Sequence, residues 1–100
     1  MKIIAKKTGG YAGLSEVTNI DTADETKLSS AEAKNIEQMV KNIGFFNLPP
    51  TTPSETVGAD LFHYEITVID GERQHTVVFD DSNSPETLPL HQLLKTLNIQ

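Results

Sequence analysis

The alternation of apolar and polar residues between positions 61 and 80 restricts the fold more than any other feature of the sequence. Two runs flank the segment Asp70–Arg73, and every second residue in them is apolar: Phe62, Tyr64, Ile66 and Val68 in the first, Val77 and Phe79 in the second. A period of two is typical of a strand with one buried face, and the glycine at position 71 favours a tight turn. The two runs therefore predict a β-hairpin.

Two registers of this hairpin fit the pattern. A two-residue loop at Asp70–Gly71 would pair Ile66 with His75, whereas a four-residue loop would pair Ile66 with Val77. Both registers leave the same residues on the same face, because they differ by an even number of positions. A three-residue loop would place Ile66 opposite Thr76, which mixes apolar with polar side chains, and we reject it.

A second hairpin is predicted near the start of the chain. Residues 2–7 begin with β-branched isoleucines, and residues 14–20 alternate loosely between apolar and polar types. The segment Gly9–Gly13 between them contains three glycines, which readily adopt the positive φ angles that a chain reversal requires. We therefore expect two strands joined by a glycine-rich turn.

An amphipathic helix is predicted after the first hairpin. Ser29 and Glu32 have the spacing of a capping box, so the helix begins near Ser29 or Ser30. Its apolar stripe is formed by Ile36, Met39, Val40 and Ile43. Gly44 follows, and it is placed to end the helix in a left-handed conformation.

The second hairpin is followed by a second amphipathic helix. Ser84 is expected to cap this helix and Pro85 to occupy its first turn, with Pro89 as a possible restart one turn later. Its apolar stripe is formed by Leu90, Leu93, Leu94 and Leu97. The element order β-β-α-β-β-α predicts an α+β fold of two ββα units, with four mainly antiparallel strands and two helices packed on one face. A chain of 100 residues has the length of one domain, so we expect a single domain over residues 1–100.

A proline-rich segment separates the first helix from the second hairpin. Residues 47–60 contain three prolines and a glycine, and such a long loop is often functional. Phe45 and Leu48 lie at its start and are expected to anchor it on the core, because aromatic side chains near a helix end usually bury.

Residues that could support catalysis or metal binding do not form a recognisable motif. The chain has no cysteine, and His63, His75 and His91 are too far apart for a zinc motif, with His63 and His75 predicted on opposite faces of their hairpin. No serine lies in a G-x-S-x-G elbow, and Gly9–Gly13 is not followed by the lysine and helix of a phosphate-binding loop. We therefore expect a binding protein with no catalytic residue, no metal site and no cofactor.

The charge balance excludes several classes of partner. The chain has 14 acidic and 8 basic residues, a formal net charge of -6, so it repels nucleic-acid backbones.

Residues 1–7 have only three apolar residues between their lysines, which is too few for a signal peptide. The longest uncharged stretch, residues 42–54, contains three prolines and cannot span a bilayer. We expect a soluble protein that is not exported by such a signal and has no nucleic-acid or membrane partner.

Several motifs occur together in an order that is more specific than any of them alone. They are Gly9-Gly10-Tyr11-Ala12-Gly13-Leu14, Gly44-Phe45-Phe46-Asn47-Leu48-Pro49, the segment from Gly58 to Val68, His75-Thr76-Val77, and the leucine-rich helix near the carboxyl terminus. In these motifs and in length the sequence resembles the emfourin family, small protein inhibitors of thermolysin-like (M4) zinc metalloproteases of the protealysin group. The resemblance implies a bacterial cytoplasmic inhibitor, not an enzyme, that blocks the substrate cleft of such a protease by loop insertion.

Two segments are candidates for contact with the protease. The first is Gly9, Gly10, Tyr11, Ala12 and Gly13, in which Tyr11 would be an aromatic anchor and the glycines would permit close approach of the backbone. In the alternative interpretation these glycines only close a hairpin and Tyr11 packs on its base. The second candidate is the loop of residues 49–60, where Glu55 or Asp60 would offer a carboxylate oxygen to the enzyme's zinc.

A different class of function also fits the sequence. The chain could be a non-catalytic regulatory or interaction module that binds a partner away from any active site. In either case we expect it to be a monomer when free.

Overall fold

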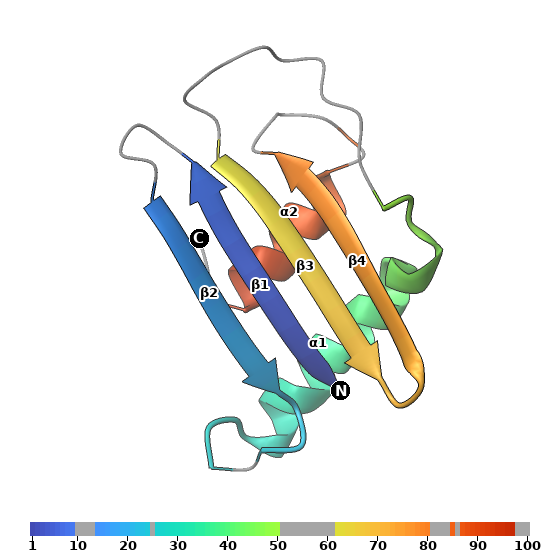
Figure 1. Ribbon diagram of the computed structural model, residues 1–100. Helices are drawn as coiled ribbons and strands as arrows, with labels where there is room; N and C mark the ends of the chain where they lie inside the picture. The colour runs from blue at the N-terminus through green and yellow to red at the C-terminus, as the bar shows by residue number, and fades with distance from the viewer. Residues whose placement is uncertain (10–13, 25, 51–61, 81–84, 86, 98–100) are drawn as a thin grey trace.

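Four antiparallel strands form one sheet, and two α-helices cover one of its faces (Figure 1). The computed structural model describes residues 1–9, 14–24, 26–50, 62–80, 85 and 87–97. The elements are β1 (Lys2–Gly9), β2 (Leu14–Asp21), α1 (Ser30–Asn42), the short 3-10 helix η1 (Phe45–Asn47), β3 (Phe62–Asp70), β4 (Arg73–Asp80) and α2 (Leu88–Thr96). The strand order is β2-β1-β3-β4, so each ββα unit contributes one inner and one outer strand. The predicted α+β fold is confirmed.

The register of the β3–β4 hairpin settles the two alternatives that the sequence left open. Ile66 pairs with Val77, as expected for the longer loop, and the pairing continues to Asp70 and Arg73. Gly71 therefore begins a tight turn, and its φ of 64° is in the left-handed region that favours glycine.

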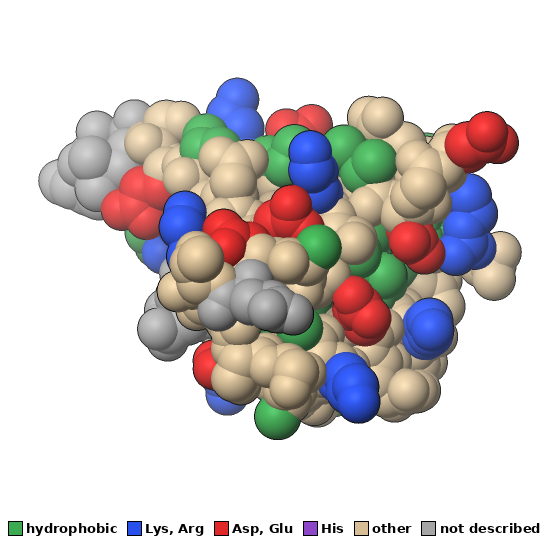
Figure 2. All heavy atoms as spheres, turned by 90° about the horizontal axis from the view of Figure 1, so that it is seen from below, with side chains coloured by type: hydrophobic (Ala, Val, Ile, Leu, Met, Phe, Trp, Pro, Cys, Tyr) green, Lys and Arg blue, Asp and Glu red, His purple; other side chains and the backbone are tan. Residues whose placement is uncertain are grey.

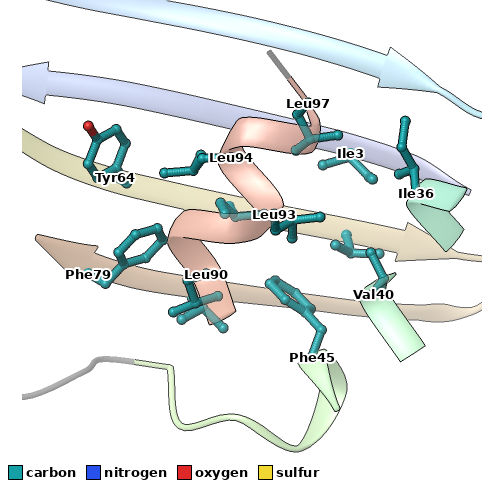
Figure 3. Close-up of a cluster of buried hydrophobic side chains, with 13 residues drawn as sticks. Ile3, Ile36, Val40, Phe45, Tyr64, Phe79, Leu90, Leu93, Leu94 and Leu97 are labelled. Atoms are coloured by element: carbon teal, nitrogen blue, oxygen red, sulfur yellow. The ribbon is translucent and has the colours of Figure 1, made fainter. Parts of the chain in front are cut away.

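The core lies between the helices and the covered face of the sheet (Figure 3). This face carries the apolar half of the alternating pattern: Ile3, Ala5, Tyr64, Ile66, Val68, Val77 and Phe79. The helices contribute Ile36 and Val40 from α1 and Leu90, Leu93 and Leu94 from α2. The apolar stripes predicted for the two helices thus meet the apolar face predicted for the hairpin.

Both ends of α1 follow the sequence signals. The Ser29 side chain accepts a hydrogen bond from the Glu32 backbone N–H, and the Glu32 side chain accepts one from the Ser29 backbone N–H, which completes the capping box. Gly44 has a φ of 65° and turns the chain out of the helix. Phe45 is then buried and Leu48 packs against the core, so both residues are the anchors that were predicted.

Replacing Ser29 with alanine should lower the free energy of unfolding by about 1 kcal/mol, because the first turn of α1 loses its side-chain acceptor. Ser30→Ala is the matched control, since Ser30 lies inside the helix and is exposed, and its effect should stay within about 0.5 kcal/mol. Urea unfolding measures both values. Equal midpoints for the two variants would contradict the role of the cap.

The start of α2 agrees with the restart at Pro89 and differs from the earlier start at Pro85. The helix begins at Leu88, with Thr87 as the N-cap residue and Pro89 in the first turn. Pro85 lies in a turn before the helix, and Ser84 is outside the described residues. The reason is that proline has no N–H to donate, so Pro89 is tolerated in a first turn but would interrupt a helix that began at Pro85. None of the described helices is long and apolar enough to cross a membrane.

Candidate functional site

Four strand termini lie side by side at one end of the sheet, which we call the loop end. Gly9, the last residue of β1, pairs with Leu14 of β2 and with Phe62 of β3, and His63 of β3 pairs with Asp80, the last residue of β4. Neighbouring strands are about 4.8 Å apart, so the four termini span about 14 Å. The strand ends to which residues 10–13 and 51–61 are attached therefore lie close together (Figure 1).

Both candidate protease-binding segments are attached to the loop end. Residues 10–13 connect Gly9 to Leu14, and residues 51–61 lead into Phe62. Gly9 has a φ of 96°, which an L side chain rarely adopts, so glycine is required where the chain leaves β1. The other candidate residues, Gly10, Tyr11, Ala12, Gly13, Glu55 and Asp60, lie outside the described residues.

Two hydrogen bonds fix the point from which residues 51–61 depart. The Val78 backbone N–H in β4 donates to the Pro50 carbonyl at 2.8 Å, and His75 Nε2 lies 2.7 Å from the Leu48 carbonyl oxygen. The His75 ring also meets the Phe45 ring edge to face, with centroids 5.7 Å apart. The chain is thus held against the outer edge of β4 immediately before the candidate segment begins.

A buried aromatic cluster supports the loop end from inside. Tyr64 and Phe79 stack with ring centroids 5.3 Å apart, and the His91 ring of α2 meets both rings edge to face at 5.9 and 5.4 Å. Figure 3 shows Tyr64 and Phe79 side by side at one end of the core. The alternating pattern predicted that Tyr64 and Phe79 are buried, but it contained no signal for the contact with His91, which comes from a distant segment. This cluster holds β3, β4 and α2 together beneath the strand termini.

The charged side chains of the described residues make a few contacts in turns and at strand ends. The one ion pair among these residues joins Arg73 to Asp70 at 3.1 Å, in the turn at the opposite end of β3 and β4. Lys7 Nζ lies 4.2 Å from the centroid of the Phe62 ring. The pKa of Asp24 is lowered because the Thr26 hydroxyl and backbone N–H both donate hydrogen bonds to its carboxylate. These contacts organise turns and strand ends.

The histidines do not come together. His63 and His75 lie on opposite faces of the sheet, as predicted, and His91 packs in the aromatic cluster. Within the described residues, no three side chains of the metal-binding types are grouped. Figure 2, which views the molecule from the end opposite to the loop end, shows acidic and basic side chains interspersed, as is typical of a solvated surface.

A sheet that holds chain segments at one end can position them for binding, because binding residues often lie on loops held by a scaffold. The Emfourin family model matches residues 5–98, nearly the full length of the chain. The chain belongs to the emfourin family, which is a family of protease inhibitors rather than of enzymes. No curated protein and no solved structure matches it.

Proposed function

We propose that this protein inhibits thermolysin-like (M4) zinc metalloproteases of the protealysin group, and that residues 10–13 enter the substrate cleft. The observation that carries the proposal is the attachment of both candidate segments to neighbouring strand termini. A segment whose ends are held by a sheet has already lost much of its conformational entropy, so less is lost on binding. The same constraint protects the inhibitor from cleavage. A peptide bond of the inhibitor that is held in place by the sheet does not reach the geometry that attack on its carbonyl carbon requires.

We also propose where the inhibitor acts and in what oligomeric state. The target would be a bacterial enzyme in the cytoplasm, and the inhibitor would be a monomer when free. Absence of cysteine is compatible with a reducing compartment.

Titration of a thermolysin-like protease with the purified protein tests the proposal. Hydrolysis of a peptide substrate should fall in proportion to added inhibitor until the two proteins are equimolar. Binding that leaves hydrolysis unchanged would instead support the interaction module, whose partner is engaged away from the active site. Full activity with no binding would refute both interpretations for this class of enzyme.

Tyr11→Ala should raise the inhibition constant by about tenfold or more, because an aromatic anchor is lost from the proposed contact. The thermal midpoint should be nearly unchanged if Tyr11 contacts the enzyme rather than its own hairpin. The inhibition constant and the thermal midpoint are measured on the same preparation. An unaltered constant would remove residues 10–13 from the contact.

The second segment offers a separate contact. Charge reversal at Glu55 or at Asp60 should abolish inhibition if that carboxylate binds the zinc, whatever the ionic strength, because a ligand would be lost. If the acid only attracts the enzyme at long range, the effect should be small and should vanish at high salt. Inhibition constants measured at two ionic strengths separate the two roles.

A further inference from the structure

The two outer edges of the sheet differ. The edge of β4 is covered at one point by the chain itself, because the Val78 N–H donates to the Pro50 carbonyl and the His75 side chain lies 2.7 Å from the Leu48 carbonyl oxygen. Within the described residues, no backbone hydrogen bond reaches the outer edge of β2. An uncovered edge presents a row of main-chain donors and acceptors that can pair with another strand.

Strand β2 also lacks several of the features that normally prevent such pairing, although Glu16 places one charge on its helix-facing side. All eight of its residues pair with β1 without a bulge, and it contains neither proline nor lysine. Val17, near its middle, is 56% exposed on the face that the helices leave uncovered. The strand is therefore regular, long enough to accept a partner strand, and has one exposed apolar side chain near its middle.

The helices stop short of β2 on the other face. Glu16 is exposed although it lies on the helix side of the sheet. Beside Ile20 there is an open hollow of about 240 Å³ between β2 and the helices, with Leu28, Ile36 and Leu97 in its lining. A strand added to β2 would extend the part of the sheet that lies over this hollow.

The charge of β2 indicates what kind of strand fits. Glu16 and Asp21 are its charged residues, and both are acidic. Lys7, the β1 neighbour of Glu16, lies over the Phe62 ring on the β3 side, and the described residues provide no ion pair for either acid. A second copy of this chain would bring the same two acids and a net charge of -6, whereas a strand with basic side chains would neutralise them.

We infer that the edge of β2 accepts an extended, basic segment of the target protease as a fifth strand. Strand β2 begins at Leu14, directly after residues 10–13, so the edge continues the surface assigned above to the cleft. The inference rests on the proposed function and adds to it a second contact, in which main-chain pairing provides affinity and the acids of β2 select the partner.

Two exposed apolar residues provide a matched pair of variants. Val17 in β2 and Leu88 at the start of α2 are each 56% exposed. Val17→Lys places a cation on the open edge and should raise the inhibition constant for thermolysin by about tenfold or more. Leu88→Lys places the same cation at an equally exposed apolar position away from β2 and should change the constant by less than about twofold.

A second pair of variants tests whether the acidic charge of β2 contributes to binding. Glu16→Lys, on the open edge, should weaken inhibition by about tenfold at low salt, and the loss should shrink as salt is added. Glu65→Lys makes the same change on the inner strand β3, where Glu65 is also exposed. Because both variants alter the net charge equally, long-range attraction affects them alike, and the difference between them measures the contact at the edge.

Amide hydrogen exchange of the unmodified protein, free and bound to thermolysin, completes the test. Exchange should slow along residues 15–20 on binding, because outward N–H groups gain acceptors. If the unmodified protein leaves thermolysin fully active, the proposed function and the inference both fail. If it inhibits, but Val17→Lys inhibits equally well or β2 exchange is unchanged, only the inference fails. It also fails if β2 is protected in a dimer of the free protein, which would assign the edge to a second copy.

Discussion

Phe45→Ala should lower the free energy of unfolding by about 3–5 kcal/mol, the range found when a buried aromatic side chain is removed. Phe45 is 1% exposed and belongs to the main core cluster, so its removal leaves a cavity that the surrounding strands and helices can fill only in part. A domain of this size has a total stability of about 5–15 kcal/mol. The variant should therefore still fold, but with a much smaller free energy of unfolding, which urea unfolding will measure.

Phe46→Ala is the control for this prediction. Phe46 is the next residue, but it is only half-buried, and Arg73 lies over its ring 4.3 Å from the centroid. Its loss should cost about 1–2 kcal/mol, in line with the smaller apolar area that it buries. If Phe46→Ala proves as costly as Phe45→Ala, the assignment of Phe45 as the anchor is wrong.

The loss of Phe45 should also weaken the attachment of the candidate segment, residues 51–61, to the sheet. Phe45 contacts the His75 ring, and His75 in turn bonds to the Leu48 carbonyl. Without Phe45 this attachment to β4 is weakened, so the departure point of the segment is less well fixed. Under conditions where the variant is folded, its inhibition constant should rise if that segment contacts the protease.

The second hairpin shows what an alternating pattern can and cannot determine. Alternation assigned Tyr64, Ile66 and Val77 to the buried face, because a period of two fixes the face of every residue in a strand. It could not choose the register, since shifts by two residues preserve all faces. The choice depends on the turn, where Gly71 adopts a positive φ and Arg73 pairs with Asp70.

Contacts between distant segments carried no local signal. Nothing in the residue pattern indicates that the Pro50 carbonyl covers β4 at Val78, because every residue has a carbonyl and its partner is set by tertiary packing. The contact of His91 with the Tyr64 and Phe79 rings joins α2 to β3 and β4 in the same way. The sequence could not choose the start of α2, because Ser84–Pro85 and Thr87–Pro89 are both plausible helix starts.

The sequence proposed candidate segments but did not indicate that they attach to the same end of the sheet. The glycines and Tyr11 favoured residues 9–13, and the acidic residues favoured the loop that ends at Asp60. Their attachment to one end of the sheet follows from the pairing of Gly9 with both Leu14 and Phe62. That pairing depends on the strand order, which brings β1 and β3 together across the 52 residues of sequence between them, and no local pattern specifies it.

Phe79→Ala should have the largest combined effect on stability and inhibition. Phe79 is 2% exposed, so its removal should cost about 3–5 kcal/mol. It also removes the ring on which Tyr64 and His91 pack directly beneath the strand termini. A loop end that is less well ordered must be ordered again on binding, and that cost raises the inhibition constant.

Ile36→Ala separates the effect of Phe79→Ala on stability from its effect on inhibition. Ile36 is buried in α1, at the other end of the core from Phe79 (Figure 3), and its loss should cost about 2–5 kcal/mol. Both variants are compared at a temperature where circular dichroism shows each to be folded. The inhibition constant should rise for Phe79→Ala and stay near the original value for Ile36→Ala, because only Phe79 supports the loop end. Equal constants for the two variants would mean that the aromatic cluster stabilises the fold without preparing the segments for the protease.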